Sequence, residues 1–133
     1  MVACSHRTGT ILTTFKELGV LPEIADALAR VDITTPFPIQ EMTLSVALMG
    51  TDLIGQARTG TGKTLAFGIP VLQRSVAPHD PDFPELAAPG KPQALIVAPT
   101  RELAIQVSSD LTLAGADRGL RILTVYGGVP YEP

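Results

Sequence analysis

The sequence predicts an α/β protein with three layers, in which helices cover both faces of a parallel β-sheet. Three short segments predicted as strands alternate with stretches predicted as helices, and a glycine-rich turn joins the first of these strands to the next helix. Strands and helices that alternate in this way are linked by crossover connections, which place the strands parallel in one sheet. Because only three strands are predicted in 133 residues, we expect the sheet to be incomplete.

The N-terminal third is expected to be helical after a loose lead-in over residues 1–14. Residues 21–31 carry apolar side chains at helical spacing, and Pro22 is compatible with the first turn of such a helix. The two prolines of residues 36–38 interrupt this pattern, because proline disfavours helix at the residue before it. A second helix is predicted over residues 39–49, where it ends at a glycine.

The remainder supplies the alternation of strands and helices. Strands are predicted over residues 52–56, 94–98 and 121–126, with helices over residues 63–74 and 100–113. Residues 94–98 form a continuous apolar run, which is typical of a strand covered on both faces. We expect Gly68 and Pro70 to weaken or kink the first of these two helices. Residues 76–92 hold five of the twelve prolines, which favours an exposed loop.

Composition limits the classes of function only coarsely. The formal net charge of −3 gives no electrostatic sign of a nucleic-acid partner, so such a partner must be argued from motifs. A single cysteine, Cys4, excludes an internal disulfide and fits a reducing compartment. No segment approaches the roughly 18 apolar residues of a membrane span, and we see no signal-peptide core. We therefore expect a cytoplasmic protein with no membrane partner.

Residues 57–64, Ala-Arg-Thr-Gly-Thr-Gly-Lys-Thr, have the pattern of a phosphate-binding loop between a strand and a helix. Gly60 and Gly62 let backbone N–H groups converge on phosphate oxygens at a helix N-terminus. Lys63 would place its charge on the β- and γ-phosphates, and Thr64 would offer its hydroxyl to Mg²⁺. The remaining side chains expected beside the nucleotide are Arg58, Thr59 and Thr61. The alternative is a glycine-rich turn with an incidental lysine.

The same turn resembles motif I of the DEAD-box ATP-dependent RNA helicases, and other segments match that family in the same order. Residues 36–40, Pro-Phe-Pro-Ile-Gln, resemble its Q motif, with Phe15 at the place of the isolated upstream aromatic. Residues 99–104, Pro-Thr-Arg-Glu-Leu-Ala, are similar to motif Ia, and residues 127–128 to the glycine doublet that follows it. The resemblance, of bacterial style, runs from Phe15 to the last residue.

The resemblance implies the first RecA-like domain of an RNA-dependent ATPase that unwinds RNA duplexes locally with ATP and Mg²⁺. It also implies that residues 15–133 are a partial domain, truncated before the acidic Asp-Glu-Ala-Asp motif of the family. The carboxylates of that motif and the arginines of a second RecA-like domain are not in this sequence. We therefore expect this chain alone to be catalytically incomplete.

Gln40 is the residue expected to select adenine, since its amide both donates and accepts, as the N6 and N7 edge of adenine requires. Without the nearby phosphate-binding loop, a surface glutamine would be the simpler interpretation. Phe15 is either a wall of the adenine pocket or an ordinary core aromatic. Asp32 and Ile33 depart from the family pattern of a glycine and an aromatic; Ile33 can press on a purine but cannot stack as an aromatic ring does.

The resemblance implies that phosphates of RNA, single-stranded or duplex, are contacted by Pro99, Thr100, Arg101, Gly127 and Gly128. The first three lie where a strand ends and a helix begins, a geometry that binds phosphate. The alternatives are a helix cap for Thr100 and a solvated or ion-paired side chain for Arg101. The glycine pair would let the backbone approach RNA closely, although it also suits an ordinary turn.

Two other functions remain open from the sequence alone. One is a non-catalytic piece that binds nucleotide or RNA. The other is a P-loop NTPase of different chemistry, such as a small-molecule kinase or a transport ATPase. The segments at residues 36–40 and 99–104 argue against the latter, because neither of those chemistries requires them.

Overall fold

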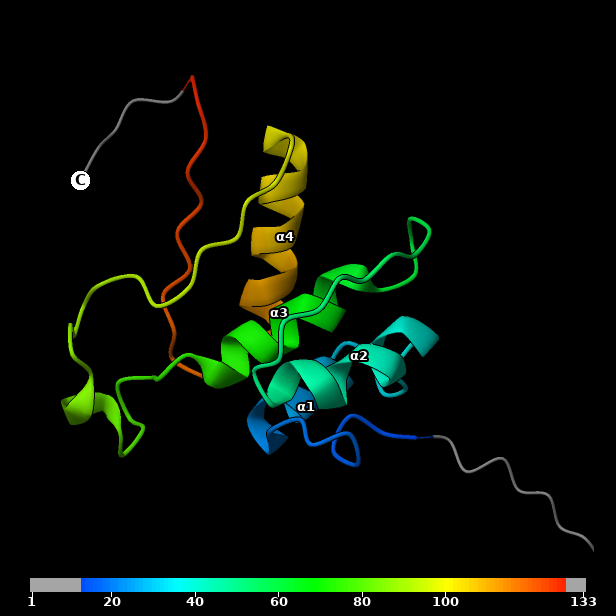
Figure 1. Ribbon diagram of the computed structural model, residues 1–133, viewed down its shortest axis with the longest axis horizontal. Coiled ribbons are helices and arrows are strands. Elements are labelled where there is room, and N and C mark those ends of the chain that lie inside the picture. Colours follow the sequence, from blue (N-terminus) through cyan, green and yellow to red (C-terminus); the bar gives the residue numbers. More distant parts are fainter. Residues whose placement is uncertain (1–12, 129–133) are drawn as a thin grey trace, which may run out of the picture.

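A computed structural model describes residues 13–128 and shows four α-helices and one short 3₁₀ helix in that part of the chain (Figure 1). The elements in order are α1 (Pro22–Ala29), α2 (Pro38–Leu48), α3 (Lys63–Arg74), η1 (Phe83–Glu85) and α4 (Arg101–Ala114). α3 lies between α2 and α4 and contacts both, while α1 packs on α4. No helix of the described residues is long and apolar enough to cross a membrane. The predicted lead-in lies outside the described residues, except for its last two.

The four predicted helices are confirmed, with boundaries that differ by about one residue, or two at the end of α1. α3 runs from Lys63 to Arg74 as one helix with Pro70 inside it, and the predicted weakening or kink at Gly68 and Pro70 stays a prediction. Gly68 has a packing role, because a Cβ built there would lie 2.6 Å from Cδ2 of Leu111 on α4. A small residue at this position therefore allows α3 and α4 to approach closely.

The three predicted strands are not confirmed in the described part of the chain. Residues 52–56, 94–98 and 121–126 have no regular secondary structure, and no backbone hydrogen bond joins them to one another. Figure 1 shows them as separate extended stretches around the helices. A strand exists only through hydrogen bonds to a neighbouring strand, so an apolar sequence alone does not produce one. The α/β sheet of the predicted fold class is thus absent from residues 13–128.

Two of the three segments, residues 94–98 and 121–126, nevertheless keep the side-chain alternation of strands, whereas residues 52–56 are exposed throughout. Ile96 and Ile122 pack against the core, whereas Leu95, Val97 and Leu123 are exposed. Successive side chains of an extended chain point to opposite sides, so one face meets the helices and the other faces solvent. The structure therefore covers one face of the predicted layer, and the prediction of burial on both faces was wrong for residues 94–98.

A cavity of about 730 Å³ lies between α2, α3 and residues 50–55. Its walls are mainly apolar and include Ile39, Phe67 and Leu53. Lys63 touches it, but the glycines of the phosphate-binding turn do not line it. The cavity thus marks incomplete packing between the helices and the unpaired segment, not the phosphate site.

Asp32 follows α1 with a φ of 62°, the left-handed region that glycine adopts without strain. The departure from glycine noted in the sequence thus falls where the backbone favours glycine. We expect Asp32→Val to lower the free energy of unfolding by about 1 kcal/mol, because a β-branched side chain is strained in this conformation. Asp82 is a matched control with a φ of −81°, so Asp82→Val should cost clearly less.

Urea unfolding followed by circular dichroism measures both variants, and Asp32→Gly should retain the wild-type stability. Equal losses for the valine variants of Asp32 and Asp82 would contradict the assignment of strain to Asp32.

Candidate nucleotide and RNA sites

The phosphate-binding turn lies directly before α3. Gly60 and Gly62 have φ values of 78° and 79°, so both use the left-handed conformation that other residues rarely adopt. A Cβ built on Gly60 would meet nothing within 4 Å, which leaves the backbone there open to a ligand. Gly62 is the N-cap of α3, and the first turn of that helix has no acidic residue. An anion at this position would meet N–H groups and the positive end of the helix dipole.

Lys63 is the first residue of α3, and its ammonium group returns to the turn that precedes the helix. Nζ donates hydrogen bonds to the carbonyl oxygen of Ala57 and, at 2.8 Å, to that of Arg58. Thr61 closes the same turn, since its hydroxyl donates to the Arg58 oxygen at 2.7 Å. To bind a phosphate, the ammonium must exchange the two carbonyl oxygens for phosphate oxygens, which carry more negative charge.

Gln40 joins the start of α2 to the start of α3. Its Nε2 donates to the carbonyl oxygen of Gly62 at 2.9 Å, and its Oε1 accepts from the backbone N–H of Phe37 at 2.8 Å. The side chain is 1% exposed, so the alternative of a surface glutamine was wrong. Each end of the amide already makes a hydrogen bond, and the second N–H and the second lone pair are buried with the residue, so they can pair with adenine only if Gln40 becomes accessible. The glutamine therefore couples the predicted base-binding segment directly to the phosphate-binding turn.

Phe37 is a site residue that the sequence analysis did not single out. Its side chain is 51% exposed although it is a large aromatic. Its ring lies against the turn, because a Cβ built on Gly62 would be 2.7 Å from Cδ2 of Phe37. The signal in the sequence was an aromatic residue between two prolines, immediately before the predicted base-binding residues. An aromatic at such a position lies outside the apolar face of the following helix.

Two residues predicted near adenine lie in or against the hydrophobic core. Phe15 is buried in the cluster formed by residues of α1, α2, α3 and α4, which is the core-aromatic alternative stated above. Ile33 is partly buried and packs against the same cluster. The exposed ring of Phe37, not that of Phe15, is thus the aromatic surface beside Gln40.

The residues predicted to contact RNA gather at the N-terminus of α4. Thr100 is the N-cap, and its hydroxyl oxygen accepts from the N–H of Leu103 at 3.2 Å, so the capping alternative is confirmed. The Arg101 side chain is 54% exposed and forms a loose ion pair with Glu102 at 3.9 Å. Gly128 lies beside Arg101, because a Cβ built on it would be 4.0 Å from Nη1. Motif Ia and the glycine doublet are therefore neighbours in space.

These features indicate the class of protein. The turn has two left-handed glycines, a lysine at the first position of the following helix and an open helix N-terminus. This arrangement is typical of the phosphate-binding loop of P-loop nucleotide-binding proteins. The model of the DEAD/DEAH box helicase family matches residues 37–133. The chain therefore belongs to the DEAD/DEAH box helicase family, and a P-loop NTPase of unrelated chemistry is excluded.

Curated relatives support this assignment. The chain is 45% identical over 121 residues to the DEAD-box ATP-dependent RNA helicase CshA of Geobacillus kaustophilus, a match that covers 91% of this chain and 24% of the relative. It is 49% identical over 121 residues to the ATP-dependent RNA helicase RhlB of Xanthomonas oryzae pv. oryzae, a match that covers 90% of this chain and 20% of the relative. The chain thus spans a fifth to a quarter of the length of these helicases.

Solved structures show the same relationship in three dimensions. The RNA helicase Prp28 from Chaetomium thermophilum, bound to ADP, has a TM-score of 0.74 and 35% identity, with coverage of 88% of this chain and 27% of that chain. Dbp5 of S. cerevisiae, bound to RNA and ADP BeF3, has a TM-score of 0.67 and 32% identity, with coverage of 80% and 25%. The described residues therefore have the fold of the matching part of these helicases, although residues 13–128 contain no paired strands.

Proposed function

We propose that the protein to which this chain belongs is an ATP-dependent RNA helicase, and that this chain supplies its nucleotide-binding turn and part of its RNA contact. The observation that carries the proposal is the hydrogen bond between Gln40 and Gly62, which connects a base-reading amide to the phosphate-binding turn. Family membership supports the activity, and the RNA bound to the similar Dbp5 supports the partner.

Each residue of the turn has a separate task in this proposal. Lys63 would bind the β- and γ-phosphates of ATP, and the hydroxyl of Thr64 would hold Mg²⁺, which supplies charge neutralisation when bound. Backbone N–H groups from Gly60 to Gly62 would bind phosphate oxygens, with Arg58 and Thr59 at the rim of the turn. Gln40 would read the adenine edge, and Phe37 would offer its exposed ring to the base.

The described residues contain no cluster of three or more His, Cys, Asp or Glu side chains that could hold a metal ion. We therefore propose that the carboxylates for Mg²⁺, and the arginines that stabilise the transition state, come from other parts of the helicase, including its second RecA-like domain. Residues 15–133 would then be the first part of RecA-like domain 1, whose sheet is completed by strands from the rest of that domain. This chain alone would bind ATP without hydrolysing it.

Arg101 and the backbone of Gly127 and Gly128 would bind RNA phosphates, which requires no basic surface over the whole chain. Thr100 would contribute its backbone, because its hydroxyl already caps α4. Pro99 would fix the entry of the chain into α4. A cytoplasmic location, expected from the sequence, belongs to the same proposal.

Loss of the Gln40 amide is expected to remove the preference for adenine. Calorimetric titration of this chain with ATP and GTP, each with Mg²⁺, should show about a 10-fold higher affinity for ATP, because a bidentate pair to a base is worth about 1–3 kcal/mol. In Gln40→Ala the ratio of the two affinities should fall to about one. Tripolyphosphate is the control ligand, since it tests the turn without a base. Gln106, exposed on α4, gives the matched control variant Gln106→Ala.

Unchanged preference for ATP in Gln40→Ala, or equal affinity of the wild-type chain for ATP and GTP, would contradict the role given to Gln40. If tripolyphosphate binding fell as steeply as ATP binding, Gln40 would act by supporting the turn and not by reading the base.

A further inference from the structure

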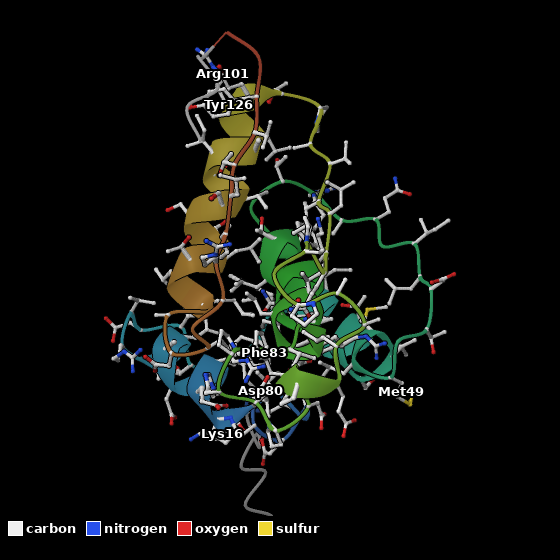
Figure 2. The ribbon with its side chains drawn as sticks, turned by 90° about the vertical axis from the view of Figure 1, so that its left-hand side faces the viewer. Lys16, Met49, Asp80, Phe83, Arg101 and Tyr126 are labelled. Carbon is white, nitrogen blue, oxygen red and sulfur yellow. The ribbon has the colours of Figure 1, made fainter. Side chains whose placement is uncertain are left out.

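Arg101 and Tyr126 form a pair at the N-terminal end of α4, where Figure 2 shows their side chains together. Cζ of Arg101 lies 5.5 Å from the centroid of the Tyr126 ring, which is within the range of a cation–π interaction. Gly128 lies on the same side, since a Cβ built on it would be 4.0 Å from Nη1 of Arg101. The guanidinium group therefore lies close to both an aromatic face and a glycine backbone.

The other interaction of the Arg101 side chain in the described residues is weak. Its ion pair with Glu102 is 3.9 Å long, and both side chains are exposed, so water and salt screen it. An unrestrained arginine loses much rotamer freedom when it binds a ligand, which lowers its affinity. A ring that stacks on the guanidinium plane restricts those rotamers and leaves the N–H groups at the edge of the plane free to donate.

We propose that Tyr126 is a positioning residue for RNA binding: its ring orients the guanidinium of Arg101 so that the N–H donors face a phosphate beside Gly128. The inference rests on the proposed role of Arg101 in RNA binding. It assigns to Tyr126 a task that needs the aromatic face and not the hydroxyl, so phenylalanine should replace it and leucine should not.

The test uses this chain and a fluorescein-labelled single-stranded decamer of uridylate, with affinity measured by fluorescence anisotropy at several salt concentrations. Arg101→Ala should weaken binding and lower the slope of log K against log salt by about 0.7, the contribution of one phosphate contact on a single strand. Tyr126→Leu should weaken binding about 3-fold, as loss of an exposed cation–π pair predicts. Tyr126→Phe should bind as the wild type does.

A double-mutant cycle separates positioning from a direct contact or a structural role. If Tyr126 acts through Arg101, Tyr126→Leu should have no effect in the Arg101→Ala background. Arg121, exposed on the same segment, supplies the charge control Arg121→Ala, for which we expect a smaller loss than for Arg101→Ala. The Nε–H resonance of Arg101 should shift in Tyr126→Leu and not in Tyr126→Phe, because the ring current depends on the aromatic face.

The outcomes distinguish the two proposals. The inference about Tyr126 would be overturned if Tyr126→Leu weakened RNA binding equally in the wild-type and Arg101→Ala backgrounds. It would also be overturned if Tyr126→Leu had no effect in either background while Arg101→Ala weakened binding. Both results leave the RNA role of Arg101 intact. RNA binding that ignores Arg101→Ala, or no binding by the wild-type chain, would overturn the proposed RNA site and this inference with it.

Discussion

The Lys63→Ala variant of this chain is expected to lose about 100-fold or more in affinity for ATP with Mg²⁺. The ammonium group already lies inside the turn, where it donates to the carbonyl oxygens of Ala57 and Arg58. A triphosphate would replace these neutral acceptors with charged oxygens, and hydrogen bonds between charged partners are worth about 1.5–3 kcal/mol each. Removal of two such bonds accounts for the expected loss, which isothermal titration calorimetry measures directly.

Lys91, in the exposed proline-rich loop, gives the matched control, because Lys91→Ala removes the same charge away from the turn. The affinity of Lys91→Ala for ATP should stay within about twofold of the wild type, since an exposed charge outside the turn is screened by water and salt. Circular dichroism should show the same helix content in both variants. Affinity of Lys63→Ala within a few-fold of the wild type would show that the turn does not bind the terminal phosphates.

The second large effect is expected from Arg118→Leu, which should lower the free energy of unfolding by about 3 kcal/mol. Arg118 is 4% exposed. It donates to both carboxylate oxygens of Asp80, at 2.7 and 3.1 Å, and to the carbonyl oxygen of Ser75 at 3.0 Å, while Glu23 on α1 lies 3.9 Å away. The guanidinium group thus joins α1, the end of α3 and the segment after α4. Its removal takes the charged donor away from Asp80 and Ser75, and Asp80 keeps the hydrogen bond from the backbone N–H of Ala77.

Urea unfolding at neutral pH measures this loss, and Arg121→Ala is the control, for which we expect a change within about 0.5 kcal/mol because Arg121 is exposed. Arg118→Lys should be intermediate, since one ammonium group cannot reproduce the bidentate contact. If Arg118→Leu were as stable as the wild type, the free-energy cost of removing the ion pair from water would equal the free energy gained from its interactions.

The same pair predicts a dependence of stability on pH. The hydrogen bond from Arg118, and then that from the backbone N–H of Ala77, lower the pKa of Asp80 below its ordinary value. A carboxylate whose pKa is lowered in the folded state stabilises the fold at pH values above its ordinary pKa. This contribution is lost as the pH falls through the lowered pKa. In Asp80→Asn the free energy of unfolding should therefore fall less as the pH is lowered than it does in the wild type. An identical pH profile for the wild type and Asp80→Asn would contradict this assignment.

The helices and the phosphate-binding turn could be predicted because their signals are local. Apolar spacing indicates α1, α2 and α4 within a few turns of sequence, and the left-handed Gly60 and Gly62 follow from a pattern of eight residues. The same kind of signal predicted three strands that are not confirmed in residues 13–128. Residues 94–98 have the composition of a buried strand, but a ladder also needs neighbours that residues 13–128 do not provide.

The sequence by itself determined the family, the position of the phosphate-binding turn and the course of the helices, because each depends on residues that are close along the chain. Only the tertiary structure decided that Gln40 bonds to Gly62, that Arg118 is buried against Asp80, and that Tyr126 lies over Arg101. These contacts join residues far apart in sequence. No periodicity or spacing encodes them, since they depend on how the helices pack and on which polar groups that packing removes from water.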